Sequence, residues 1–138
     1  MHNITSPRPV TDETIEQEIV RKDLTAPRVT PEDLEAEVAS EHYFTAGQGA
    51  WAAAADSVMD SGGVISSSDA KPLPMSLRLL TFCVLVLRNG FTVTGESACA
   101  SPENFDAEVG RKIARQKAVE KVWPLLGFRL RDQLVSTA

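Results

Sequence analysis

Residues Leu79–Ala98 read LLTFCVLVLR-NG-FTVTGESA, and they carry the strongest structural signal in the chain. An Asn-Gly pair between two runs rich in β-branched and aromatic residues is typical of a β-hairpin. A two-residue turn at Asn89-Gly90 fixes the register, so that Val86 pairs with Val93 and Val84 pairs with Gly95. The sequence therefore predicts two antiparallel strands joined by a tight turn.

The two predicted strands differ in how apolar their faces are. One face of this hairpin gathers five apolar side chains, Phe82, Val84, Val86, Phe91 and Val93. The other face sets Cys83, Leu85 and Leu87 against Glu96, Thr94 and Thr92. The first strand is apolar on both faces, and a two-stranded ribbon is marginal by itself, so both faces need a cover. One helix covers only one of them.

The second cover is either the N-terminal helices or another subunit. Because those helices carry few apolar residues, we favour a homo-oligomer. Its interface would include Leu85, Leu87 and Glu96. Glu96 is either a solvated charge or the partner of an arginine such as Arg111 or Arg115 across that interface.

A helix that covers the hairpin is expected directly after it. Ser101-Pro102-Glu103 has the order of cap, proline and acid that begins a helix, which we expect to end at Trp123. Two stripes follow from its helical spacing, one apolar (Phe105, Val109, Ile113) and one of small residues that admits a close neighbour (Gly110, Ala114, Ala118). A short last helix is predicted over Pro124–Leu134, although alternating residues there also suit a strand.

The first half of the chain has a different character. Val10–Val20 and Val29–Ala39 each predict a short acidic helix, with Thr11 and Thr30 as N-caps. From Thr45 the sequence becomes rich in Ala, Gly and Ser, and we expect a flexible connection there. The whole is one α+β domain, organised as an acidic helical segment (1–44), a flexible linker or insertion (45–77) and a hairpin–helix core (78–138).

The charges are distributed unevenly along the 138 residues. Residues 1–70 carry thirteen acidic and four basic residues, whereas the remainder carries ten basic and six acidic ones. Basic residues gather between Arg111 and Arg131, which makes a local positive patch in a chain of net charge −5. This patch is either a solvated face, the surface against which the acidic helices pack, or an anion-binding site. Arg111, Lys112 and Arg115 are the candidate ligand-binding residues.

Patterns for catalysis or metal binding are sparse. His2 and His42 are isolated, and no histidines or cysteines have the spacing of zinc ligands. Cys99 precedes a predicted helix and is a conceivable nucleophile, but its one candidate base is His42. Cys83 and Cys99 point to opposite faces of the predicted hairpin, so we expect no disulfide. We therefore expect neither an enzyme nor a cofactor or metal. The longest apolar run, Phe82–Leu87, is too short to cross a membrane, and we see no secretion signal.

Three stretches resemble a known family. They are Asn89–Cys99 (NGFTVTGESAC), Ser101–Ala114 (SPENFDAEVGRKIA) and Val122–Leu126 (VWPLL). They are similar to the small tailed-phage and prophage protein family named after phage N4 gene product 49 and phage Sf6 gene 66. The resemblance is close over Leu79–Leu134 and loose over Val29–Phe44, and it leaves out Val10–Val20. It implies a phage accessory product made in the cytoplasm of the infected bacterium, with no established reaction or catalytic residues.

Two functions from different classes follow from these observations. The first is a non-enzymatic, homo-oligomeric protein that acts on a host component, in counter-defence, by holding an anionic ligand such as a nucleotide at Arg111, Lys112 and Arg115. Nucleic acid is the weaker choice, because an acidic protein repels a polyanion. The second is a protein-interaction module that inhibits a host protein through its acidic helices. An enzyme that uses Cys99 or Glu96 is a remote third hypothesis.

Overall fold

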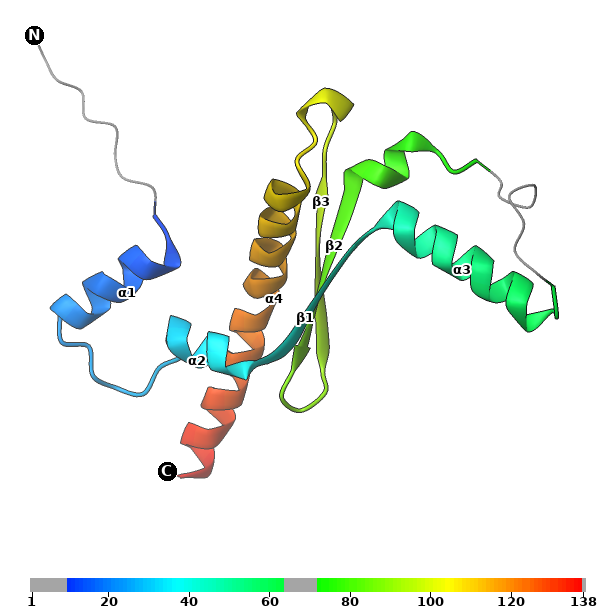
Figure 1. Ribbon diagram of the computed structural model, residues 1–138. Helices are drawn as coiled ribbons and strands as arrows, with labels where there is room; N and C mark the ends of the chain where they lie inside the picture. Colours follow the sequence, from blue (N-terminus) through cyan, green and yellow to red (C-terminus); the bar gives the residue numbers. More distant parts are fainter. Residues whose placement is uncertain (1–9, 64–71, 138) are drawn as a thin grey trace, which may run out of the picture.

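The computed structural model describes residues 10–63 and 72–137 and confirms an α+β fold. A three-stranded antiparallel sheet in the order β1-β2-β3 lies against one long helix, α4 (Figure 1). The elements follow in this order: α1 (Asp12–Arg21), α2 (Pro31–Glu37), β1 (Val38–Thr45), α3 (Ala46–Asp60), η1 (Met75–Leu79), β2 (Leu80–Leu87), β3 (Thr92–Ala98), η2 (Pro102–Asn104) and α4 (Ala107–Ser136).

The predicted hairpin is present as β2 and β3, but its predicted register is wrong by one residue. Val86 pairs with Thr92, and Val84 pairs with Thr94. The reason is the loop, which has three residues, Arg88 to Gly90, instead of two. The amide of Gly90 donates to the carbonyl of Leu87 at 2.9 Å, and Gly90 has a φ of +87°. This is a turn followed by a left-handed glycine, the usual three-residue alternative to a two-residue hairpin loop.

The corrected register moves every side chain of β3 to the other face. Cys83 and Leu85 now lie opposite Gly95 and Val93, and this face packs on α4. Leu85 and Leu87 are therefore buried inside the chain, and the expectation that they form a subunit interface is wrong. The other face, which we call the outer face, carries Phe82, Val84 and Val86 with Thr92, Thr94 and Glu96.

Strand β1 was not predicted. We expected the second acidic helix to continue to Ala39, but α2 ends at Glu37 and the chain continues as a strand paired with β2. His42 lies opposite Val84, and Tyr43 lies opposite Cys83. The sheet therefore gains a third strand at its edge, while α1 and α2 lie beside α4 and leave the outer face uncovered (Figure 1).

The C-terminal region is one helix where we expected two. Asp106 caps α4 and accepts a hydrogen bond from the amide of Val109 at 2.9 Å, so the helix begins five residues later than predicted. Pro124 lies inside the helix without ending it. A proline there leaves the carbonyl of Glu120 without its helical donor, but both residues are exposed and water can replace that bond.

The predicted stripe of small residues on α4 is confirmed. Gly110, Ala114 and Ala118 are all buried against the sheet. A Cβ atom on Gly95 of β3 would lie 2.0 Å from the carbonyl oxygen of Ala114. The core therefore depends on an unusually close approach of a strand to a helix, with Leu34, Leu85 and Val122 filling the space beside it.

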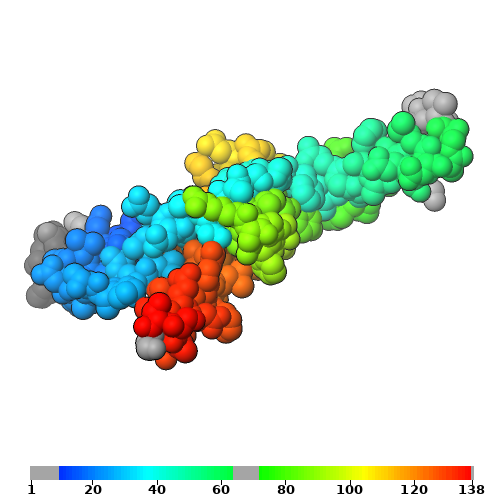
Figure 2. Space-filling view, turned by 90° about the horizontal axis from the view of Figure 1, so that it is seen from below, coloured from blue at the N-terminus to red at the C-terminus, as the bar shows by residue number. Residues whose placement is uncertain are grey.

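The expected flexible connection contains a regular helix. Thr45 caps α3 and shares a capping box with Gln48, and the helix then runs for 15 residues. Residues 64–71 of that predicted connection lie outside the described residues. In Figure 2, α3 extends the molecule at one end and α1 extends it at the other, so the protein is elongated. Thr11 and Thr30 cap α1 and α2 as predicted.

Candidate functional site

The three predicted anion-binding residues do not converge on a free site. Arg111 and Lys112 are exposed on α4, and Lys112 forms an exposed ion pair with Glu108 at 3.2 Å. Arg115 points instead toward β1 and α2, where it donates hydrogen bonds to two carboxylates. Arg111 and Lys112 therefore face the solvent, whereas Arg115 is hydrogen-bonded to other residues of the same chain.

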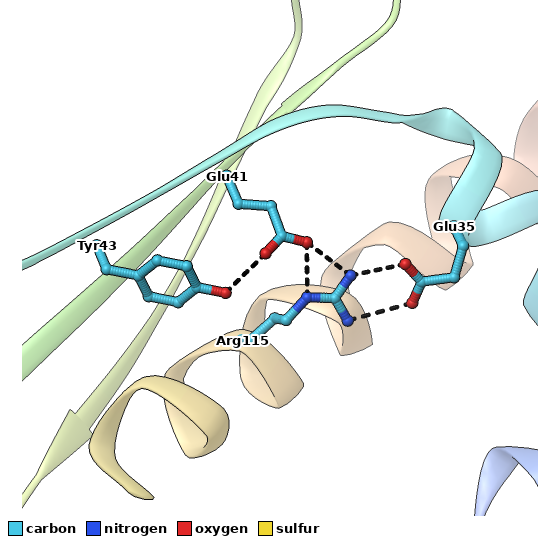
Figure 3. Close-up of polar contacts among 4 residues, drawn as sticks. All are labelled: Glu35, Glu41, Tyr43 and Arg115. Atoms are coloured by element: carbon cyan, nitrogen blue, oxygen red, sulfur yellow. Dashed lines mark hydrogen bonds and ion pairs between the residues drawn. The ribbon is translucent and has the colours of Figure 1, made fainter. Parts of the chain in front are cut away.

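Arg115 of α4 joins this helix to α2 and β1, two consecutive elements whose carboxylates lie 80 and 74 positions earlier in the chain (Figure 3). Its Nε donates to Glu41 of β1 at 2.8 Å. Its two terminal nitrogens donate to the two carboxylate oxygens of Glu35 in α2, at 3.1 and 2.7 Å. The hydroxyl of Tyr43 donates to the second oxygen of Glu41 at 2.9 Å. We call these four residues the Arg115 cluster. A planar guanidinium satisfies two carboxylates in this way, whereas a lysine does not.

The electrostatics of the Arg115 cluster favour its ionised form. Hydrogen bonding to Glu35 is the main reason that the pKa of Arg115 is raised. Burial by itself raises the pKa of Glu41, but hydrogen bonds from Arg115 and Tyr43 outweigh it and the net pKa is lowered. Burial and the bond to Glu41 raise the pKa of Tyr43. An external anion at Arg115 would have to displace two carboxylates, so the cluster is suited to fastening β1 and α2 onto α4.

Glu96 is the one predicted interface residue that faces outward. It lies half-buried on the outer face, where the hydroxyl of Thr94 donates to it at 3.4 Å. No ion pair with Glu96 is present within residues 10–63 and 72–137. Its carboxylate is therefore not neutralised by a cation of the described residues.

The outer face has an apolar centre and a polar border. Phe82, Val84 and Val86 run along its middle strand and are only partly buried. The ring of Phe44 stacks on Phe82 with centroids 5.6 Å apart and is 39% exposed. Polar side chains flank this centre on both edge strands, namely Ser40 and His42 on β1 and Thr92, Thr94 and Glu96 on β3.

A separate cleft of about 630 Å³ lies where α3 begins. Trp51, Arg78 and Phe105 are among its lining residues. It is wide open to solvent, and it brings a single cation together with apolar side chains. The cleft offers contact area but no convergent set of catalytic groups.

Chemistry elsewhere in the chain is limited. The described residues contain no group of three or more side chains placed to bind a metal, and none of their helices is long and apolar enough to span a membrane. Cys83 and Cys99 are both free, although the register from which we argued this is wrong by one residue. Burial raises the pKa of the Cys83 thiol, which makes it less reactive. The thiol of Cys99 donates to the carbonyl of Ser101 at 3.1 Å.

Sequence reasoning missed Glu41 and Tyr43 because it missed strand β1. The available signal was the run His42-Tyr43-Phe44-Thr45, in which aromatic and β-branched residues are typical of a strand. Glu35 was recognised only as part of an acidic helix. No local sequence pattern shows that Arg115 lies beside Glu41 and Glu35, which are 74 and 80 positions away in the chain.

Comparison with known proteins gives one result. The profile of the family described as phage protein (N4 Gp49/phage Sf6 gene 66) matches residues 29–134. This range begins before α2 and ends two residues before the end of α4, so it contains the sheet, the Arg115 cluster and the outer face. No curated protein and no solved structure matches the chain.

Proposed function

This chain belongs to the phage protein (N4 Gp49/phage Sf6 gene 66) family, and on that premise we propose that it is a non-catalytic binding protein that engages a host protein through its outer face. The contact takes place in the cytoplasm of the infected bacterium. The observation that carries the proposal is the outer face itself, where the apolar side chains of the central strand remain partly exposed in the chain alone.

The composition of the outer face fits a protein partner. An apolar centre bordered by polar side chains is the usual anatomy of a protein interface. Phe82 and Phe44 supply aromatic area at its end, and Glu96 supplies a carboxylate at its border. The partner is therefore a protein that presents an apolar surface with an arginine or lysine placed opposite Glu96.

The other two hypotheses from the sequence have weaker support. An anionic small molecule would need Arg115, which Glu35 and Glu41 already neutralise. Recognition through the acidic helices would use their carboxylates, and two of these are already paired, Glu16 with Arg28 and Glu18 with Lys22. Because of these ion pairs, both the surface around Arg115 and the acidic helices have less unpaired charge for a ligand or partner than the sequence implies.

Site-specific crosslinking tests the proposal. A photo-reactive benzoylphenylalanine replaces Val84 at the centre of the outer face, and a control protein carries it at Gln116, an exposed position on α4. Both proteins are expressed in the bacterial host and irradiated. We expect a crosslink to one host protein from position 84, no such crosslink from position 116, and loss of the crosslink when Glu96→Arg is added.

Binding of the purified host protein then decides the matter. We expect Glu96→Arg to weaken binding at least about tenfold through like-charge repulsion, and the control Glu103→Arg on η2 to leave it unchanged. Three results would contradict the proposal: equal crosslinks from positions 84 and 116, a crosslink from position 84 only to a second copy of the chain, or host-protein binding that Glu96→Arg does not alter.

A further inference from the structure

The C-terminal third of α4 carries a second exposed apolar surface. Leu125, Phe128 and Val135 are 38%, 72% and 59% exposed. Successive residues of an α-helix turn by about 100°, so Phe128 and Val135 lie opposite the buried Leu126, and Leu125 lies beside Phe128 at the border toward the buried Val122. In Figure 2 this end of α4, drawn in red, stands out from the body of the molecule. We call the side that carries these residues the tail ridge.

Charged residues border the tail ridge in a symmetrical order. Glu120-Lys121 lies on the N-terminal side of Leu125 and Phe128, and Arg131-Asp132 lies on the C-terminal side. All four charged residues are exposed, and no ion pair in the described part of the chain includes any of them. Lys121 and Asp132 lie at equal distances on either side of the midpoint between Leu125 and Phe128, and they carry opposite charges.

We propose that a second copy of this chain docks on the tail ridge, with the two α4 helices antiparallel about a twofold axis. Leu125 then packs on the partner subunit's Phe128, and the symmetry repeats this contact. About 8 Å from the axis, at 1.5 Å per residue, Lys121 meets the partner subunit's Asp132.

The shape of the tail ridge suits such a pairing. Pro124 and Gly127 lie on the edge where Glu120 and Arg131 also lie, and a Cβ on Gly127 would meet no atom within 4 Å. Small side chains at a helix surface let two helices approach closely. The self-complementary charges favour a second copy over an unrelated protein, since an isologous interface requires each half to match the other. The outer face takes no part and remains open to a host protein.

Charge reversal tests this pairing with matched variants. Lys121→Asp sets two aspartates against each other in a homodimer, and Asp132→Lys sets two lysines against each other. Sedimentation equilibrium should show a dimer for the unaltered full chain and at least about tenfold weaker self-association for each variant. An equimolar mixture of the two variants should restore a dimer, which native mass spectrometry identifies as the heterodimer. The double variant Lys121→Asp/Asp132→Lys should also dimerise.

The control is Arg111→Asp, which makes the same change of charge on the same helix but outside the tail ridge. It should dimerise like the unaltered chain, and circular dichroism should show the same helix content in every variant. A monomeric unaltered chain would overturn the proposal. So would a mixture of the two single variants that fails to form the heterodimer, or an Arg111→Asp variant that weakens association equally.

Discussion

Gly95 is the residue at which strand and helix come closest. A methyl group there would meet the carbonyl oxygen of Ala114 at 2.0 Å and the amide nitrogen of Ala118 at 2.4 Å. Both are backbone atoms of a long helix and have no rotamer by which to move aside. We expect Gly95→Ala to lower the free energy of unfolding by about 3 kcal/mol or more, measured by urea denaturation.

Gly49→Ala is the matched control for Gly95→Ala. Its added methyl group would meet the ring of Phe44 at 3.6 Å, an ordinary contact, and alanine favours a helix over glycine by about 1 kcal/mol. This variant should be as stable as the original or slightly more so. Equal stability of the Gly95→Ala variant and the original would show that α4 lies farther from β3.

Arg115→Met tests the fastening role of the Arg115 cluster. It leaves the hydrogen bonds of Glu35 and Glu41 unmade while keeping an unbranched apolar chain in place of the arginine stem. Because the side chains of these three residues are 28–57% exposed, solvent compensates for part of the loss. We expect Arg115→Met to lower the free energy of unfolding at pH 7 by about 1–2 kcal/mol, measured by urea denaturation. Lys112→Met, which removes a more exposed pair, should change it by less than about 0.5 kcal/mol.

The pH dependence of stability gives an independent test of Glu41. The pKa of Glu41 is lower in the folded chain than in the unfolded one. Glu41 therefore stabilises the fold at pH values above the ordinary carboxylate pKa, and this stabilisation is lost as the pH falls through the depressed pKa. In urea denaturation between pH 7 and pH 3, the free energy of unfolding should fall more steeply with decreasing pH for the original chain than for Arg115→Met. Identical slopes would mean that Arg115 does not depress this pKa.

Among the secondary-structure elements, the hairpin register is open to a direct test. Val86 and Thr92 face each other across β2 and β3 in a pair without mutual backbone hydrogen bonds, where the Cα atoms lie close together. Val86→Cys/Thr92→Cys, in a Cys99→Ser background, should oxidise readily to a disulfide. Mass spectrometry after alkylation measures the yield. Val86→Cys/Val93→Cys, the pair that a two-residue turn would bring together, should remain reduced because Val93 points toward α4.

The elements that could be predicted from sequence are those whose signals are local. Two strands, their turn and the small-residue stripe of α4 each follow from spacing within about twenty residues. The loop length of the hairpin does not, because Asn89-Gly90 fits both a two-residue and a three-residue connection and only packing decides. Strand β1 acquires its place from β2, which follows about forty residues later in the chain. The partners of Arg115 are farther away still, at 74 and 80 positions, so no local pattern indicates them.

For the whole molecule, α1 should prove separable from the rest. Glu16 reaches Arg28, and Trp123 donates from its indole nitrogen to Asp12 at 3.1 Å, but no residue of α1 is buried. Removing residues 1–28 should leave the main thermal transition within a few degrees of the original and change the fluorescence of Trp123. An aggregated or unfolded product would show that α1 is part of the core.

The position of α4 in chain order also bears on synthesis. All three strands leave the ribosome before the helix that covers them, so their buried face, with Leu85 and Val93, stays open to water until α4 has emerged. The core therefore closes only after translation has passed the helix. A nascent chain that stalls before this point presents an uncovered apolar sheet to chaperones and proteases, and the bacterium would clear it as it clears other unfinished proteins.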